Sequence, residues 1–266
     1  MKIILSRKGF DSSNGGCPSP IMPDGTLLSM PIPSEDDEAT YDDLEYKGTS
    51  YTEILKGLRP KGGFNRCHVD PDIRENCRKH PVKNWRAAFG QIGAAQGLLT
   101  NAGVESGDIF LFFGWFRPVE FKDGRYQYVS RKTGSFYDHA DMHIIYGYLQ
   151  IGEIHKDLSS FPWHPHASYT GQPNAIYTAA DKLSLDPKLK GYGTLDYRKD
   201  RVLTMENCNR GTWIPHPFLM PEHIYGDRKN GAKGEGLYYP GIWQELVISE
   251  SEGLMDWMKK VLTDDK

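Results

Sequence analysis

Residues 107–116 read GDIFLFFGWF and carry the strongest strand signal in the chain. A Gly-Asp turn leads into an uninterrupted run of apolar and aromatic residues, which is typical of a buried strand. Residues 124–129 follow an Asp123-Gly124 pair, and such a pair favours a hairpin between the flanking strands. Residues 142–152 read MHIIYGYLQIG and predict a third strand. The middle of the chain is therefore expected to form a sheet.

Weaker signals predict further elements on both sides of this region. Residues 2–5, KIIL, predict a short strand, and two more are expected near 201–205 and at 244–248. Helical spacing predicts a helix over 84–103 from the apolar residues Trp85, Ala88, Phe89, Ile92, Ala95 and Leu99. Its expected N-cap is Asn84 and its expected terminator is Gly103, while three internal glycines each weaken it by about 1 kcal/mol.

The carboxyl end of the chain predicts a second helix. Ser249 and Glu252 have the spacing of a capping box. Its apolar face would consist of Leu254, Trp257, Met258 and Val261. With neither an internal repeat nor a clear linker, residues 1–266 are interpreted as one α+β domain with long loops, in which helices flank a mixed or antiparallel sheet.

Composition excludes several classes of protein. Hydrophobic residues make up 38% of the 266 residues, which rules out a disordered chain. No stretch approaches the roughly 18 apolar residues of a membrane span, and the amino terminus lacks the apolar region of a signal peptide. Four cysteines in so long a chain do not make a disulfide framework. We therefore expect a cytoplasmic protein without a membrane partner.

Charge is distributed unevenly, although the net charge is only −3. Residues 35–45 hold seven acids and no Lys or Arg, so about 34–46 are expected to form an acidic surface excursion. Residues 53–86 hold nine Lys or Arg against four acids. This segment is either a local phosphate-binding face or an ordinary solvated region.

The loop after the first strand, SRKGFDSSNGG at residues 6–16, is the most informative polar segment. Its glycines would let backbone amides approach an anion, although the spacing is not that of a Walker loop. Asp11 sits there beside two cations, which would keep it ionised. A carboxylate on a loop held by a buried strand is a favoured catalytic placement. The alternative is a local turn in which Asp11 caps its own backbone.

Histidines and cysteines give no clean metal motif. His164 and His166 flank a proline, which breaks the i, i+4 helical geometry of a zincin-like pair, and no Glu accompanies them. Cys67-His68 and Cys77-x-x-His80 supply ligand types, but the first does not have the spacing of a zinc knuckle. The cysteines are more simply buried small residues, and no Gly-x-Ser-x-Gly elbow of a hydrolase is present. A bound metal is not expected.

Aromatic residues cluster in or near the predicted strands. Successive strand residues face opposite sides, so about half of these rings are expected in the core, and the others are free to line a slot for a planar ring. The strand patterns at 107–113 and 144–152 resemble those of PUA-like barrels, which include the EVE, ASCH and YTH domains. That resemblance implies a barrel element and an aromatic pocket for a flipped or modified base.

A longer pattern extends over most of the chain. It consists of LSRKGFDSS at 5–13, PSPI at 18–21, PIP at 31–33, CHVDPD at 67–72, the strand at 107–116 and HIIYG at 143–147. This pattern resembles the third nucleotide modification associated domain family. That family is associated with modified DNA in bacteria and phages. The resemblance implies a phage-defence DNA glycosylase that removes glucosylated hydroxymethylcytosine.

The implied chemistry assigns roles to particular residues. A carboxylate, Asp11, would stabilise the oxocarbenium ion of the sugar and orient water, with His143 as the second catalytic candidate. The base would first leave the helical stack. Arg7 and Lys8 would neutralise phosphates, and the segment 53–86 would extend that contact. The other residues expected to bind substrate are Ser6, Phe10, Ser12, His68, Asp70, Trp115, Phe116, Tyr137 and Asp141. Neither a metal nor a cofactor is needed.

Two alternatives remain open at this point. A reader of modified bases would have the same aromatic slot and basic face but would leave no abasic site. An enzyme that builds or trims a nucleotide modification would instead depend on free nucleotide, nucleotide-sugar or metal. The partner in the first two hypotheses is DNA that carries modified bases.

Overall fold

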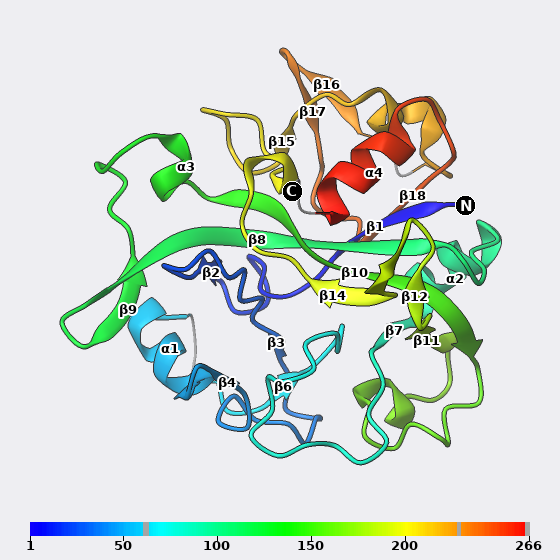
Figure 1. The fold of residues 1–266 in the computed structure, drawn as a ribbon, viewed down its shortest axis with the longest axis horizontal. Helices are drawn as coiled ribbons and strands as arrows, with labels where there is room; N and C mark the ends of the chain where they lie inside the picture. Colours follow the sequence, from blue (N-terminus) through cyan, green and yellow to red (C-terminus); the bar gives the residue numbers. More distant parts are fainter. Residues whose placement is uncertain (61–63, 228–229, 264–266) are drawn as a thin grey trace.

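A mixed sheet of nine strands forms the centre of the computed structural model, which describes residues 1–60, 64–227 and 230–263 (Figure 1). Along its main path the order is β18 (Glu245–Ile248), β1 (Ile3–Arg7), β8 (Ile109–Lys122), β10 (Met142–His155), β11 (Asn174–Ala179) and β7 (Ala88–Ile92). Off this path lie β14 (Tyr192–Thr194), which pairs with β10, and β2 (Ser19–Ile21) and β9 (Arg125–Tyr128), which pair with β8. The predicted α+β class and mixed sheet are confirmed.

Strand directions explain why the sheet is mixed. β1 runs parallel to β8 and antiparallel to β18, while β8 and β10 form a long antiparallel pair. The hairpin predicted at Asp123-Gly124 joins β8 to β9. The path stays open because it ends at β18 on one side and β7 on the other, so the predicted barrel element is wrong.

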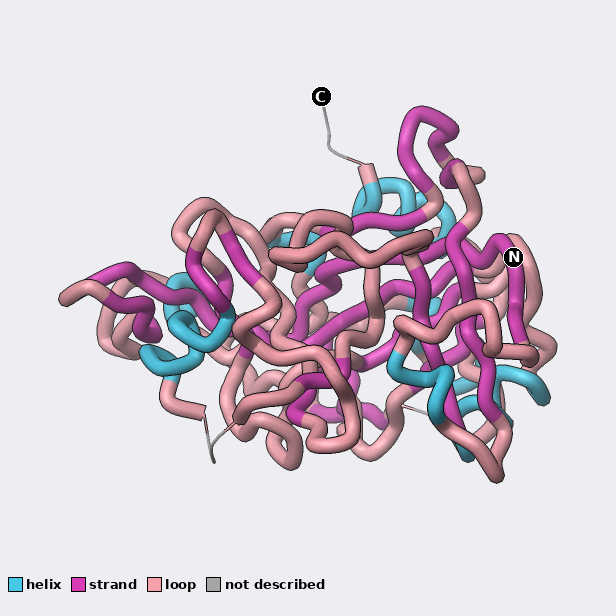
Figure 2. Tube along the Cα trace, turned by 90° about the horizontal axis from the view of Figure 1, so that it is seen from below, coloured by secondary structure: helices cyan, strands magenta, loops and turns pink. Residues whose placement is uncertain are grey.

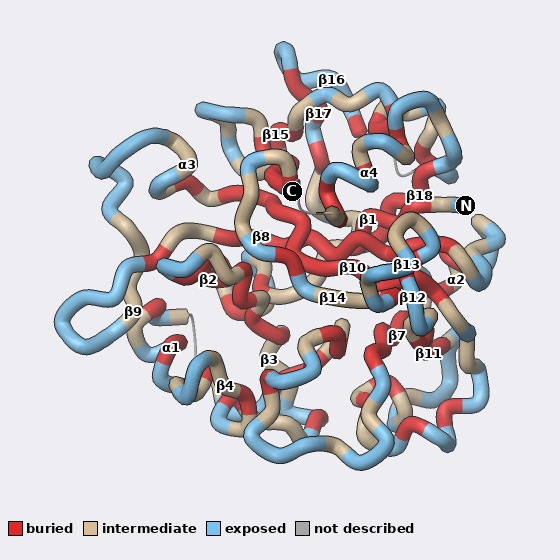
Figure 3. Tube along the Cα trace, in the orientation of Figure 1, coloured by how far each residue is buried: buried red, intermediate tan, exposed pale blue. Residues whose placement is uncertain are grey.

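The sheet is covered on both faces. Ile3 and Leu5 of β1 enter one buried apolar cluster, and Ile4 between them enters another. The same alternation divides Ile109 and Phe110 of β8, because successive strand side chains face opposite sides. Figure 3 shows the resulting buried strands in the middle of the molecule. The helix α4 (Leu254–Leu262) packs Leu254, Met258 and Val261 into the first cluster.

The predicted helix over 84–103 is wrong in its first half and confirmed in its second half. Residues Ala88–Ile92 are the edge strand β7, and only Gly93–Asn101 form a helix, α2. A short buried apolar run has the same composition in either state, and pairing with β11 decides it. Asn84 is not an N-cap, since its φ of 59° is left-handed.

Two other local predictions are also wrong. Residues 201–205 form isolated bridges at Val202 and Thr204 rather than a strand. The last helix is present, but its N-cap is Gly253, which has no side chain to cap it, so the expected box of Ser249 and Glu252 does not form there.

The segment between β2 and β7 builds a third apolar cluster. The helix α1 (Tyr51–Leu58) buries one face there, and it lies beside β9 in Figure 1. The acidic stretch about 34–46 contributes the buried residues Asp37, Tyr41 and Leu44. The acids Glu35, Asp36, Glu38 and Asp42 of this stretch are exposed, while the buried residues between them anchor it to the core. Cys17, Cys67 and Cys77 are buried and unpaired, as expected.

The remaining elements are short, and Figure 2 shows long loops in front of the strands. The strands are β3 (Ile32–Pro33), β4 (Glu45–Tyr46), β5 (Thr49–Ser50), β6 (Cys67–His68), β12 (Lys182–Leu183), β13 (Asp186–Lys190), β15 (Thr212–Trp213), β16 (Gly231–Lys233) and β17 (Gly236–Tyr238). The helices are α3 (Phe136–His139) and the 3-10 turns η1 (Pro165–Ser168), η2 (Lys199–Arg201), η3 (Pro217–Leu219) and η4 (Pro221–His223). Among the described residues, no helix is long and apolar enough to cross a bilayer.

Candidate functional site

Two cavities meet at the loop that follows β1. The first, which we name the histidine cavity, has a volume of about 260 Å³, and its lining includes Lys8, His68, Asp70, Gln91, His166, Tyr169 and Gln244. The second, the arginine cavity, has a volume of about 460 Å³, and its lining includes Ser12, His143, Asn209, Arg210, Gly211 and Tyr239. Arg7 and Asp11 line both cavities and therefore mark their junction.

Asp11 is held by contacts to both of its carboxylate oxygens. Oδ1 accepts the backbone N–H groups of Ser13 and Asn14 at 2.8 and 2.7 Å, so the local-turn interpretation is correct for this oxygen. Oδ2 lies 3.0 Å from Nη1 of Arg7. The Nε of Arg7 is buried and has no hydrogen-bond partner within the described chain. The junction thus presents a fixed carboxylate beside a guanidinium group whose buried Nε is unpaired among the described residues.

Phe10 anchors this loop in the third apolar cluster. Its ring is 1% exposed and packs against Tyr41. A Cβ on Gly15 would lie 2.4 Å from that ring, and the φ of Gly15 is +83°, so glycine is required there. Phe10 therefore anchors the turn that presents Asp11 and has no free face for a base.

A buried polar network lies behind the histidine cavity. Oε1 of the fully buried Glu245 accepts hydrogen bonds from Ser6 Oγ at 2.9 Å and from Gln91 Nε2 at 2.6 Å. Nζ of Lys8 lies 3.3 Å from the same oxygen and 4.4 Å from the centre of the Phe89 ring. This network fixes Lys8 in the cavity wall. Ser6 takes part in the network through Glu245 but lines neither cavity.

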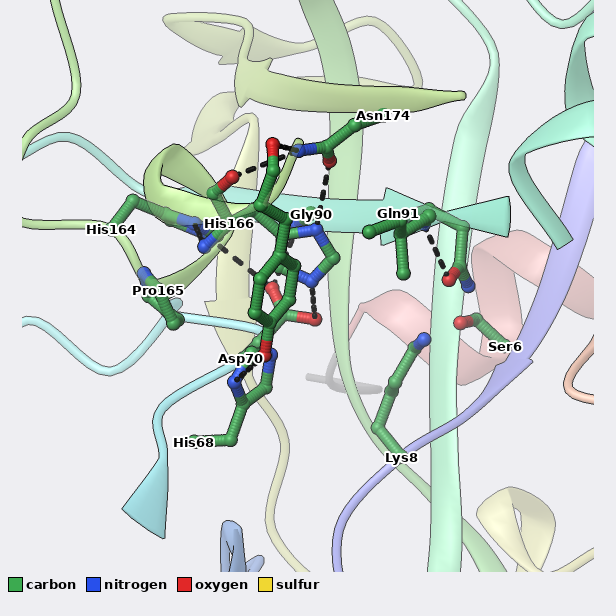
Figure 4. Close-up of polar contacts among 12 residues, drawn as sticks. Ser6, Lys8, His68, Asp70, Gly90, Gln91, His164, Pro165, His166 and Asn174 are labelled. Atoms are coloured by element: carbon green, nitrogen blue, oxygen red, sulfur yellow. Dashed lines mark hydrogen bonds and ion pairs between the residues drawn. The ribbon is translucent and has the colours of Figure 1, made fainter. Parts of the chain in front are cut away.

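Asp70 is the buried carboxylate of the histidine cavity, with a side chain that is only 4% exposed. Figure 4 shows it among His68, His164 and His166. Oδ1 accepts the Gly90 N–H at 2.7 Å and lies 3.5 Å from Nε2 of His164. Burial alone would raise the pKa of Asp70, but His164, His166 and Lys8 outweigh it and hold that pKa well below its usual range. Asp70 is therefore ionised at neutral pH.

Two histidines face Asp70 from different segments. His68 ends β6, and its Nδ1 lies 2.8 Å from Oδ2 of Asp37. His166, on η1, has its Nε2 3.9 Å from Oδ2 of Asp70. Burial lowers the pKa of His166 to about 4, because the Asp70 carboxylate only partly offsets the loss of hydration. One ligand atom each from His68, Asp70 and His166 lie within 4.8 Å of one another, a donor set that suits a metal ion.

Gly90 allows this arrangement. A Cβ at this position would lie 2.3 Å from the His166 ring. The edge strand β7 therefore gives both a backbone N–H to Asp70 and the space that His166 fills.

The arginine cavity has a different chemistry. Arg210 lies over the Trp115 ring at 3.9 Å and lines the cavity beside Arg7. His143 is buried, and its Nδ1 accepts the Nε1–H of Trp213 at 3.0 Å. Burial and the charges of Arg210 and Arg7 hold the pKa of His143 well below 6.5. A neutral His143 then carries its hydrogen on Nε2 and acts as a donor.

Several residues predicted to bind substrate lie outside both cavities. Phe116 is fully buried in the core. Trp115 and Asp141 are joined by a 3.3 Å hydrogen bond and reach the arginine cavity only through Arg210. Tyr137 lies under Lys199 instead. Among the described residues of the basic segment 53–86, no Lys or Arg lines either cavity.

Other lining residues were not singled out from the sequence. They are Gln91, Tyr169, Arg210 and Gln244, together with Asn174, which supports His166 from behind. The His164-Pro165-His166 signal was visible, but its partners His68 and Asp70 lie about a hundred residues earlier in the chain. Spacing alone does not reveal that approach.

One comparison identifies the family. A family model described as nucleotide modification associated domain 3 matches residues 2–245. The chain belongs to this family. All residues of both cavities fall within the matched range. The function of this nucleotide modification associated domain is therefore linked to nucleotide modification. No curated protein and no solved structure matches the chain.

Proposed function

We propose that this protein is a DNA glycosylase that excises a modified cytosine, of the glucosylated hydroxymethyl type, from phage DNA. The observation that carries the proposal is that Arg7 and Asp11 line both cavities. A flipped nucleotide has a base on one side of its sugar and phosphates on the other. If each cavity takes one of these parts, the N-glycosidic bond lies at Asp11.

The arginine cavity has the chemistry of a phosphate site. Arg7 and Arg210 supply positive charge, and Ser12, Ser13 and Asn209 supply polar groups. Most contacts between proteins and DNA go to phosphates, and they set position rather than sequence. A base-flipping protein needs such phosphate contacts, since extrusion of the nucleotide costs a few kcal/mol.

The histidine cavity has the chemistry of a base site. Lys8, Gln91 and Gln244 offer polar groups, and Tyr169 adds an aromatic ring. Enzymes that flip bases read them by hydrogen bonds to their edges and by stacking. A sugar attached to the base would add hydroxyl groups, which the same polar side chains are suited to bind.

Asp11 is the proposed catalytic carboxylate. In hydrolysis the C1′–N1 bond breaks with its electron pair leaving on the base, and positive charge develops on the sugar. The Asp11 carboxylate stabilises that charge and orients a water molecule for attack on C1′. The proton released by this water passes to Asp11 and then to solvent, and the departing base takes up one proton from solvent. The products are the free base and an abasic site.

A strand-scission assay tests the proposal. End-labelled duplexes carry cytosine, hydroxymethylcytosine or glucosylated hydroxymethylcytosine at one position, and each is incubated with the full chain, with EDTA or with added Zn²⁺. We expect cleavage at the modified position only after hot alkali, which reveals an abasic site. Binding without cleavage under every condition would indicate a reader instead, and dependence on a free nucleotide would indicate an enzyme that edits nucleotides.

A further inference from the structure

We propose that His68, Asp70 and His166 bind one divalent transition-metal ion, of the Zn²⁺ or Fe²⁺ type, in the wall of the histidine cavity. All three residues line that cavity, and their ligand atoms lie within 4.8 Å of one another. This inference does not rest on the proposed glycosylase activity, because the ligands and their supports stand independently of Asp11.

The hydrogen bonds behind the two histidines set their tautomers. A carboxylate only accepts, so the Nδ1 of His68 carries the hydrogen in its 2.8 Å contact with Asp37. The amide of Asn174 is oriented by two donations from its Nδ2, to the carbonyls of His166 and Tyr169. Its Oδ1 therefore faces Nδ1 of His166 at 3.1 Å and accepts from it. With the hydrogen of each ring placed on Nδ1 by these contacts, Nε2 is the nitrogen left for a ligand in both rings.

Asp70 is supported in a matching way. The Gly90 N–H and Nε2 of His164 both approach Oδ1. The Nδ1 of His164 accepts the His166 backbone N–H at 3.2 Å, so its own hydrogen is on Nε2, toward Asp70. Oδ2 is thereby left for a ligand. Metal-binding histidines almost always donate their other N–H to a carboxylate or carbonyl oxygen, and metal-binding carboxylates are themselves hydrogen-bonded.

A simple ion pair does not explain this geometry. Nε2 of His166 is 3.9 Å from Oδ2 of Asp70, too far for a hydrogen bond. Ligands about 2.1 Å from a common ion lie roughly 3 to 3.5 Å apart. Binding therefore requires the 3.9 Å pair of His166 and Asp70 to close by about half an ångström, and a pair at the 4.8 Å limit to close by more than one ångström. A cation would fill the gap between two imidazole nitrogens and a carboxylate oxygen.

The donor set selects the class of metal. Two imidazole nitrogens and one carboxylate suit Zn²⁺ or Fe²⁺. Mg²⁺ and Ca²⁺ prefer oxygen ligands. Three protein ligands leave at least one position open toward the cavity for water or for a substrate oxygen.

Metal binding to the full chain tests the proposal. The purified protein is stripped with EDTA and titrated with Zn²⁺, with Co²⁺ as a visible probe, and with Mg²⁺ by calorimetry. We expect one Zn²⁺ per chain and no measurable binding of Mg²⁺ at the same concentration. The double variant His68→Gln/His166→Gln should lose at least about 100-fold in Zn²⁺ affinity. His80→Gln, at an exposed histidine outside both cavities, should lose none.

Asn174→Ala provides a second arm in case the double variant does not fold. It removes the acceptor that fixes Nδ1 of His166, together with the two Nδ2 donations to the carbonyls of His166 and Tyr169, and keeps all three ligands. We expect Zn²⁺ affinity to fall about 10-fold to 100-fold. The absence of stoichiometric Zn²⁺ and Co²⁺ binding to the wild type would overturn the proposal. Unchanged Zn²⁺ affinity in a folded variant would overturn it as well. Because the readout is binding, an inactive glycosylase would not affect this result.

Discussion

The histidine cavity and the arginine cavity share Arg7 and Asp11 but differ in what surrounds those two residues. The histidine cavity places an ionised Asp70 among imidazoles whose ring hydrogens are assigned by neighbouring oxygens. The arginine cavity places two guanidinium groups and one neutral histidine around polar loop residues. The first resembles a place for chemistry or coordination, and the second a place that holds an anion. Under the proposed function, this difference would place the base and the phosphates of a nucleotide on different sides of Asp11.

The largest expected effect is at the junction itself. Asp11→Asn should reduce base excision by about 10²-fold to 10⁴-fold, because it removes the charge that stabilises the oxocarbenium ion. DNA affinity should change little, since Arg7 keeps its own charge. Single-turnover excision and equilibrium binding on the same modified duplex measure the two effects separately.

Asp24→Asn is the matched control for this experiment. Asp24 also uses one oxygen to cap a backbone N–H, that of Thr26, and places the other 2.7 Å from a cation, Lys47. It lines neither cavity. Excision should stay at the wild-type rate in Asp24→Asn, whereas an equal loss in both variants would show that Asp11 serves only its turn.

A smaller effect is expected in the arginine cavity. Arg210→Gln should weaken DNA binding about sixfold at 0.15 M salt and reduce the salt slope by about 0.9, as expected for one lost phosphate contact. The effect should be the same on modified and unmodified duplexes. Binding isotherms across a salt series measure both quantities.

Arg86→Gln tests the competing view that the basic segment 53–86 binds DNA. Arg86 also lies over an aromatic ring, that of Phe161 at 5.5 Å, but it lines neither cavity. We expect its salt slope to match the wild type. If the salt slope fell in Arg86→Gln and stayed at the wild-type value in Arg210→Gln, the basic segment would be the part that contacts phosphate.

Sequence patterns predicted the sheet well because its strands are long and bounded by turns. The 107–116 pattern and the Asp123-Gly124 hairpin are both local signals, and both are confirmed by β8 and β9. β7 was missed because its apolar run is equally compatible with a helix, and only pairing with β11 decides between them. The same error hid Gly90, whose lack of a side chain makes room for His166.

The predicted site residues that line the cavities come mostly from one contiguous segment. Arg7, at the end of β1, and Lys8, Asp11 and Ser12, in the loop after it, all line the cavities. The predicted residues His68, Asp70 and His143 line them from other segments. The approach of His166 to Asp70 depends on a sheet that joins distant segments, and no spacing rule describes that approach. Burial also decides which aromatic residues belong to the site. Phe116 packs into the core, while Tyr169 lines the histidine cavity.

The smallest expected effect concerns His143 in the arginine cavity. It distinguishes a neutral His143, which donates a hydrogen bond, from a protonated His143, which can act as a general acid. Burial beside Arg210 and Arg7 holds its pKa in the folded state well below the unfolded value near 6.5. Below pH 6.5 the unfolded chain therefore gains a proton that the folded chain does not, and stability falls by up to about 1.4 kcal/mol per pH unit. His143→Gln should remove this contribution, so its melting temperature should decline less steeply than that of the wild type between pH 6.5 and 5.

His80→Gln, at an exposed histidine, should keep the wild-type slope. Equal slopes for His143→Gln and the wild type would mean that His143 takes up a proton as readily in the folded as in the unfolded chain, and His143 would then be able to act as an acid toward the departing base.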